Sequence, residues 1–180
     1  EDLCSAHDFA SQGYARGVSM GGDLAVPPST AAAPRFAVWA ARDAGTETLP
    51  GTPLQRIQIV KLWADGAVAR ERVYDVAGDA SNDADVDLAT CAPRGQGADT
   101  LCSTWRDPDF HPNAPALYYA RDAKNPPCRT THTDSNPRHH DPASRAPDGL
   151  EACCDAGVPK TLQERAWTSP IWFSPRDPAA

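Results

Sequence analysis

The chain has 180 residues, a formal net charge of −7, 18 prolines and 41% hydrophobic residues. A chain of this length and composition forms one domain with a real core, which excludes an intrinsically disordered protein. The acidic balance, without a basic stripe, excludes nucleic-acid binding, and no apolar run approaches the roughly 20 residues that cross a bilayer.

The clearest element in the sequence is a β-hairpin. Leu54–Trp63 is rich in β-branched and aromatic residues, and Ala67–Val76 returns along it. Between them, Asp65-Gly66 predicts a type I′ turn. Ile59 and Val60 are both apolar although neighbouring side chains point to opposite faces of a strand. The first strand is therefore predicted to lie in the centre of a sheet, with both faces partly buried.

Further apolar segments predict more strands, and helix signals are weak. Asp8–Tyr14 and Leu150–Cys154 each suggest one short helical turn, and Pro170 restricts the last predicted strand to a sheet edge or a bulge. The aromatic residues are interpreted as core. We expect an all-β fold, an immunoglobulin-like β-sandwich with long disulfide-stapled loops and little helix, as one domain over residues 1–180. The remaining predicted strands are Arg35–Arg42, Thr100–Trp105, Ala116–Arg121 and Arg165–Phe173, and the aromatic residues assigned to the core are Trp63, Tyr118, Tyr119, Trp167 and Trp172.

The cysteines indicate an oxidising compartment. Their even number and loop-rich surroundings favour disulfides over buried thiols or a zinc site, for which paired C-x-x-C spacing is typical. Gly95 and Gly97 could let the chain double back and bring Cys91 next to Cys102, although the sequence does not choose among the pairings. The irregular stretch Asn125–Pro159 is predicted to be stapled down by disulfides. The six cysteines are Cys4, Cys91, Cys102, Cys128, Cys153 and Cys154.

Two motifs suggest chemistry only superficially. Gly17–Gly21 matches the G-x-S-x-G elbow of α/β-hydrolases, which requires a helix after the serine. Pro27-Pro28 follows too closely for that helix, so a glycine-rich turn is the preferred interpretation. A possible metal constellation of His132, His139 and His140, near Asp134 and Asp141, lies in the irregular stretch and is interpreted as a surface loop.

An acidic loop offers a weak calcium candidate. Asp83, Asp85 and Asp87 could supply carboxylate oxygens, the ligands that calcium prefers. An EF-hand starting at Asp83 fails, because Leu88 stands where glycine is needed and Arg94 stands where glutamate is needed. A solvated acidic loop is the simpler interpretation. No motif in the chain amounts to a complete catalytic set.

Six blocks of the sequence, in order and over nearly the whole chain, resemble the C-terminal part of the bacterial domain-of-unknown-function family 3604. Members of that family carry, upstream, a barrel similar to the PHP (polymerase and histidinol phosphatase) metal-dependent hydrolases. The family commonly has proline where this chain has Ser19, which also argues against a serine nucleophile. The blocks are Gly17–Leu24, Leu54–Lys61, Glu71–Ala77, Val86–Cys91, Trp105–Phe110 and Gln163–Trp172.

The resemblance implies a specific role. The chain would be the C-terminal accessory β module of an exported, periplasmic or secreted hydrolase, packing on the catalytic barrel of the same protein. It would hold no cofactor itself, and the barrel would bind the divalent metal. Arg106, Asp107, Asp109 and Arg165 are the candidate pocket or barrel contacts, with local salt bridges as their alternative role.

A second hypothesis is a free-standing, non-catalytic β-sandwich that binds a protein, a glycan or calcium. The chain starts at Glu1, which suggests a mature or trimmed chain.

Overall fold

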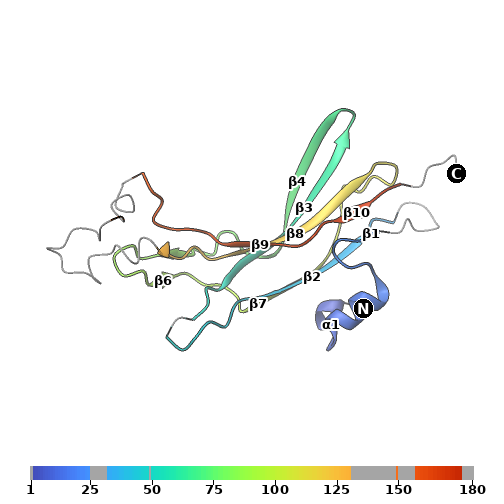
Figure 1. Cartoon of the computed structure of the whole chain (residues 1–180). Coiled ribbons are helices and arrows are strands. Elements are labelled where there is room, and N and C mark those ends of the chain that lie inside the picture. The colour runs from blue at the N-terminus through green and yellow to red at the C-terminus, as the bar shows by residue number, and fades with distance from the viewer. Residues whose placement is uncertain (1, 25–31, 49, 131–148, 150–156, 176–180) are drawn as a thin grey trace.

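A computed structural model describes residues 2–24, 32–48, 50–130, 149 and 157–175 (Figure 1). The described part is mostly strand and confirms the expected all-β, sandwich-like fold. Its helices are the 3-10 turn η1 (Leu3–Ser5) and α1 (Phe9–Arg16), which extends beyond the predicted single turn. The strands are β1 (Asp23–Leu24), β2 (Arg35–Ala41), β3 (Leu54–Asp65), β4 (Val68–Gly78), β5 (Asp85–Val86), β6 (Pro93–Arg94), β7 (Thr100–Arg106), β8 (Ala116–Lys124), β9 (Arg165–Trp167) and β10 (Ile171–Phe173).

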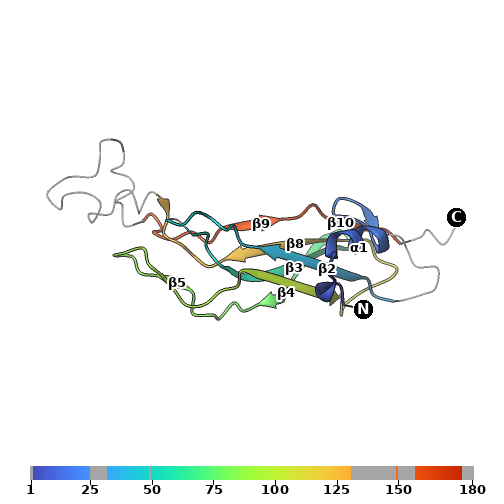
Figure 2. The same ribbon diagram turned by 90° about the horizontal axis from the view of Figure 1, so that it is seen from below.

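Two unequal layers form the sandwich. The larger sheet has six strands in the order β1-β10-β8-β3-β4, with β9 also paired to β8. The second layer is the antiparallel ribbon β2–β7, which lies below the large sheet in Figure 1 and in front of it in Figure 2. A small hairpin, β5–β6, stands apart from both. Strand β3 pairs on both sides, with β4 and β8, and is the predicted central strand.

The core lies between the large sheet and the ribbon. Phe36 of β2 packs its ring 4.5 Å from that of Tyr118 on β8, measured between centroids. Trp105 of β7 packs 4.8 Å from Tyr74 of β4 in the same way. These contacts join the two layers. The buried core residues are Phe36, Ile59, Ala116, Tyr118 and Phe173, with Trp63 and Trp105 among the partly buried side chains packed on them.

The β3–β4 hairpin is confirmed, with a different turn. Asp65 pairs with Val68, which puts Gly66 and Ala67 at the two central turn positions. Gly66 has φ of +61°, and Ala67 is not among the residues with positive φ. A glycine with positive φ at the first central position alone is typical of a type II′ turn, whereas type I′ needs positive φ at both. The prediction of Asp65-Gly66 as a type I′ turn is therefore wrong by one residue.

The C-terminal strand is interrupted, as Pro170 predicts. Strands β9 and β10 both pair with the same side of β8, separated by Thr168–Pro170. The core assignment of Trp167 and Trp172, however, is wrong, because both side chains are exposed.

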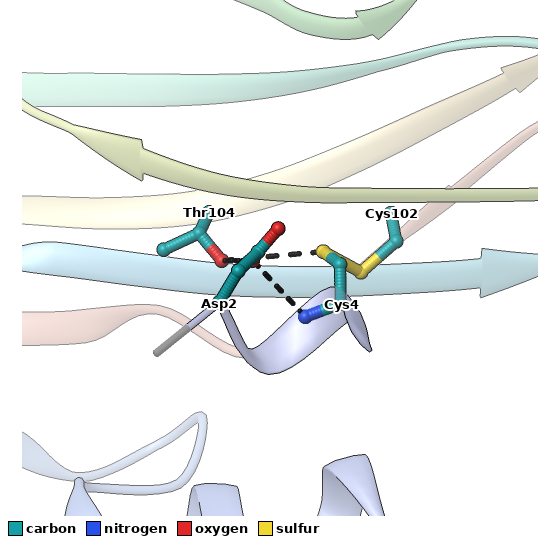
Figure 3. Close-up of a disulfide and its surroundings, with 4 residues drawn as sticks. All are labelled: Asp2, Cys4, Cys102 and Thr104. Carbon is teal, nitrogen blue, oxygen red and sulfur yellow. Dashed lines mark hydrogen bonds between the residues drawn. A yellow bond between two sulfur atoms is a disulfide. The ribbon is translucent and has the colours of Figure 1, made fainter. Parts of the chain in front are cut away.

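Two disulfides stabilise the described part, and neither joins Cys91 to Cys102. Cys4 pairs with Cys102, and Cys91 pairs with Cys128. Cys102 lies within β7, opposite Trp39, and faces η1 rather than the turn after β5. Figure 3 shows Asp2 beside the first disulfide, where its carboxylate accepts hydrogen bonds from Thr104 Oγ1 (2.8 Å) and Cys4 N (3.1 Å). Cys153 and Cys154 lie outside the described residues, as does the helical turn expected at Leu150–Cys154.

The second disulfide holds the neck of the predicted irregular stretch. Arg129 N donates to Lys160 O (2.9 Å), and Leu162 N donates to Pro127 O (3.1 Å), so the two ends of Asn125–Pro159 run side by side. Cys128 within this neck is joined to Cys91, next to the β5–β6 hairpin. The stretch is thus stapled at its base, where the structure describes it.

Candidate functional site

Three buried polar side chains meet between the two layers, and we call Lys61, Asp107 and Tyr118 the Lys61 cluster. Lys61 lies on central strand β3 and is directly opposite Tyr118 of β8. Asp107 follows the last residue of β7, where the chain turns toward β8. Lys61 Nζ lies 2.6 Å from Asp107 Oδ2, and the Tyr118 hydroxyl donates to the same oxygen at 2.7 Å. Only 4% of Lys61 and 2% of Asp107 are exposed.

The cluster is closed by the turn after β7. The backbone N–H of Asp109 donates to Asp107 Oδ1 (2.9 Å), an Asx-type turn across Pro108. Lys61 Nζ donates a second hydrogen bond to the carbonyl of Asp109 (2.6 Å). Both carboxylate oxygens of Asp107 are therefore occupied by protein donors. The geometry makes Asp107 a structural anchor between β3, β7 and β8.

A more exposed ion pair continues the cluster to the surface. Asp109 Oδ2 accepts from Arg72 Nη1 (2.5 Å) and from the Tyr74 hydroxyl (2.7 Å), both on β4. These two hydrogen bonds hold the pKa of Asp109 below its usual range, and the hydrogen bond from Tyr74 has the larger effect. Burial raises the pKa of Tyr118, and the hydrogen bond to Asp107 adds to that rise. One turn thereby ties both strands of the β3–β4 hairpin to β7.

The Tyr74 hydroxyl provides a pH-dependent test of this contact. Burial, followed by the hydrogen bond to Asp109, raises the pKa of Tyr74 to about 12. An unfolded tyrosine titrates near 10, so the folded state holds the proton more tightly. The contribution of Tyr74 to stability is then complete below about pH 10 and is lost as the pH rises toward 12. Alkaline absorbance titration should show a tyrosine step near pH 12 that Tyr74→Phe removes; a step that survives the substitution contradicts the assignment.

The four residues predicted as pocket contacts do not form one site. Asp107 and Asp109 are joined in the turn just described. Arg106 is exposed at the end of β7, opposite Arg35 of β2. Arg165 lies on β9 opposite Ala123, five residues along β8 from Tyr118, and hence on the other face of the sheet. Asp107 does form a salt bridge, the alternative role expected of these residues, and its partner is Lys61.

The pairing of Lys61 with Asp107 was not predicted, although the sequence contained a signal that Lys61 needs a partner. Lys61 stands inside an apolar run on the predicted central strand, and lysine is almost never fully buried without a partner. A buried lysine at this position predicts a carboxylate partner. Only the topology of the fold shows that this carboxylate belongs to Asp107.

The acidic loop is organised by its own backbone. Asp87 accepts from Ala89 N (2.8 Å) and Thr90 N (3.2 Å) and pairs with Arg94, and the Ala89 hydrogen bond is the largest cause that lowers the pKa of Asp87. Asp85 lies on β5 opposite Arg94, and Asp83 has a positive φ of 53°. Within residues 2–24, 32–48, 50–130, 149 and 157–175, no three His, Cys, Asp or Glu side chains are grouped to hold a metal ion.

The other sequence motifs give no catalytic geometry. At Gly17–Gly21 a helix precedes the turn and β1 follows it, the reverse of a nucleophile elbow. Gly22 N donates to Ser19 O (3.1 Å), as in the glycine-rich turn that the sequence suggests. His132, His139 and His140, with Asp134 and Asp141, lie outside the described residues. No helix in the described part is long and apolar enough to cross a membrane.

Comparison with known proteins gives one result. The family model described as "Protein of unknown function (DUF3604)" matches residues 1–175. No curated protein and no solved structure matches the chain.

Proposed function

We propose a function from the premise that this chain belongs to the DUF3604 family, whose model matches residues 1–175. The chain is the C-terminal accessory β module of a PHP-like metal-dependent hydrolase. In this proposal the catalytic barrel lies upstream in the same bacterial protein and binds the divalent metal, which activates water for hydrolysis. In this proposal, the ligands of that metal all come from the barrel and none from the present chain. Its role is to pack on the barrel and to support one side of it.

The observation that carries the proposal is an exposed and firmly anchored hairpin. Every residue from Ala64 to Val73 is exposed, and the closed end of β3–β4 projects away from the β2–β7 ribbon (Figure 1). Val68 and Val73 are among the exposed apolar side chains. A two-stranded hairpin is marginally stable by itself, yet this one is fixed at its base by the Lys61 cluster and by Asp109. An exposed projection that is anchored in this way suits contact with a neighbouring domain.

Export to the periplasm or beyond is part of the proposal. The Cys4–Cys102 and Cys91–Cys128 disulfides are of the kind that form and persist in oxidising compartments. They join segments 98 and 37 residues apart, so each links parts of the chain that are distant in sequence rather than closing a local turn.

The proposal is tested on the complete protein. The coding sequence upstream of Glu1 should encode a barrel with an H-x-H motif. The purified full-length protein should hydrolyse bis-p-nitrophenyl phosphate with Mn²⁺ or Zn²⁺ and lose that activity with a chelator. The 180-residue chain alone, as the matched control, should be inactive under the same conditions. A gene that encodes only this chain, or hydrolysis by the isolated chain, contradicts the proposal.

A further inference from the structure

An interruption in the C-terminal strand places two tryptophans on one face of the large sheet. Trp167 lies opposite Arg121 of β8, and Trp172 lies opposite Leu117. Side chains five residues apart on a regular strand point to opposite faces, but the partners of these tryptophans are only four residues apart. The segment Thr168–Pro170 therefore adds one residue, as a β-bulge does, and brings both indoles to the same side.

The interruption is held in place by β8. Thr168 N donates to Ala120 O (3.0 Å), and Ala120 N donates to the Thr168 hydroxyl (3.0 Å). Pro170, which lacks an N–H, lies where the ladder is broken. The backbone positions of the two tryptophans are thus about 13 Å apart along the sheet, from four residues of strand. Trp167 is 60% exposed and Trp172 is 48% exposed, with Tyr119 of β8 on the same face between them.

A hollow of 480 Å³ runs along β9 next to the first tryptophan. Its volume lies within the range of about 300–1,000 Å³ that is usual for small-molecule sites. Because its lining comes from both faces of the strand, the hollow lies along the sheet edge. Two of the lining groups, Lys124 and Glu164, form an ion pair at 3.0 Å. The lining includes Trp167 with Asp122, Lys124, Gln163, Glu164 and Arg165.

The charges of the lining are balanced. Two carboxylates stand against one ammonium and one guanidinium group, so the hollow favours neither an anion nor a cation. Carboxylates accept hydrogen bonds, whereas lysine and arginine donate them. A ligand that suits this lining is uncharged and carries groups that both donate and accept. The exposed indoles add flat apolar faces with a polar edge.

We propose that the β9 edge hollow, together with Trp167 and Trp172, is a binding site for a neutral oligosaccharide. Sugar hydroxyls both donate and accept, and the C–H face of a sugar ring stacks on an indole. The backbone spacing of about 13 Å between the two tryptophans exceeds one sugar ring, so a chain of several units is needed to reach both. This site is separate from the β3–β4 hairpin and does not depend on the role of that hairpin.

The test is affinity electrophoresis of the 180-residue chain in native gels. The gels contain xylan, galactomannan or mixed-linkage β-glucan as neutral polysaccharides, and alginate as the anionic comparison. At least one neutral polysaccharide should retard the chain. Trp167→Ala and Trp172→Ala should each weaken retardation at least tenfold, and Trp167→Phe should keep part of it. Trp39→Ala is the matched control, because Trp39 is 54% exposed on β2 and should leave retardation unchanged.

Several outcomes overturn the site. Retardation by none of the neutral polysaccharides, or by alginate alone, contradicts a neutral oligosaccharide site. Equal weakening by Trp39→Ala shows that any exposed tryptophan suffices. If Trp167→Ala leaves retardation intact but loosens the packing of this chain on an upstream barrel, the face is a protein contact instead. Metal-dependent hydrolysis by the full-length protein is measured separately, so failure of either proposal is distinguishable from failure of the other.

Discussion

Asp107→Ala is expected to lower the free energy of unfolding by about 3–5 kcal/mol, the usual cost of removing one partner from a buried ion pair. The substitution leaves the ammonium of Lys61 almost fully buried without the carboxylate to which it is hydrogen-bonded. It also removes the acceptor of the Tyr118 hydroxyl and of the Asp109 N–H. Urea unfolding of wild type and variant, followed by tryptophan fluorescence, measures the loss.

Two further variants separate this structural role from a general effect of charge. Asp109→Ala removes a neighbouring carboxylate that is itself about half exposed, as is its ion-pair partner Arg72, and it should cost much less than Asp107→Ala. The double variant Lys61→Met/Asp107→Leu removes both charges and should recover most of the lost stability, because apolar replacements of a buried pair are often neutral or stabilising. An Asp107→Ala variant as stable as wild type would show that Asp107 is not a structural anchor.

Loss of the Cys4–Cys102 disulfide, by Cys4→Ser with Cys102→Ser, is expected to lower the free energy of unfolding by roughly 2–5 kcal/mol. The bond joins residues 98 positions apart, and a loop of that size gives about 4.7 kcal/mol from chain entropy alone. Neither η1 nor α1 contains a buried residue, so the disulfide is a principal attachment of this N-terminal segment. Guanidinium unfolding gives the loss, and trypsin should cut faster after exposed Arg16.

The Cys91–Cys128 bond supplies the matched comparison. It closes a separation of 37 residues, so Cys91→Ser with Cys128→Ser should cost somewhat less. That variant should leave cleavage after Arg16 unchanged, because η1 stays bonded to β7. Equal acceleration of cleavage in both variants would contradict the local attachment of the N-terminal segment through Cys4.

The sequence predicted elements whose signal is local. The apolar run of β3, the return strand β4 and the break at Pro170 all depend on neighbouring residues, and all are found. The exposure of both Trp167 and Trp172 was missed, because the inserted residue at Thr168–Pro170 brings onto one face two side chains that an uninterrupted strand would place on opposite faces. A one-residue shift moves every following side chain to the other face of the sheet, and the composition of the segment does not indicate such a shift.

Pairing over long distances was beyond sequence reasoning. Cys4 reaches Cys102 only because η1 lies against β7. Lys61 reaches Asp107 only because the end of β7 packs against β3. The first contact depends on the placement of η1 against the ribbon, and the second depends on the stacking of the ribbon on the large sheet. Asp107 and Asp109 were predicted as pocket or barrel contacts because they are charges beside aromatics, and the fold places Asp107 in a closed internal anchor.

Hydrogen–deuterium exchange of the β3–β4 hairpin tests the central claim, that this chain is an accessory module packed on a catalytic barrel. Amides of Ala64–Val73 are compared in the isolated 180-residue chain and in the full-length protein. Slower exchange of these amides in the full-length protein, with little change in the buried part of β3, is the predicted result. Identical exchange of Ala64–Val73 in both proteins would contradict packing through the hairpin.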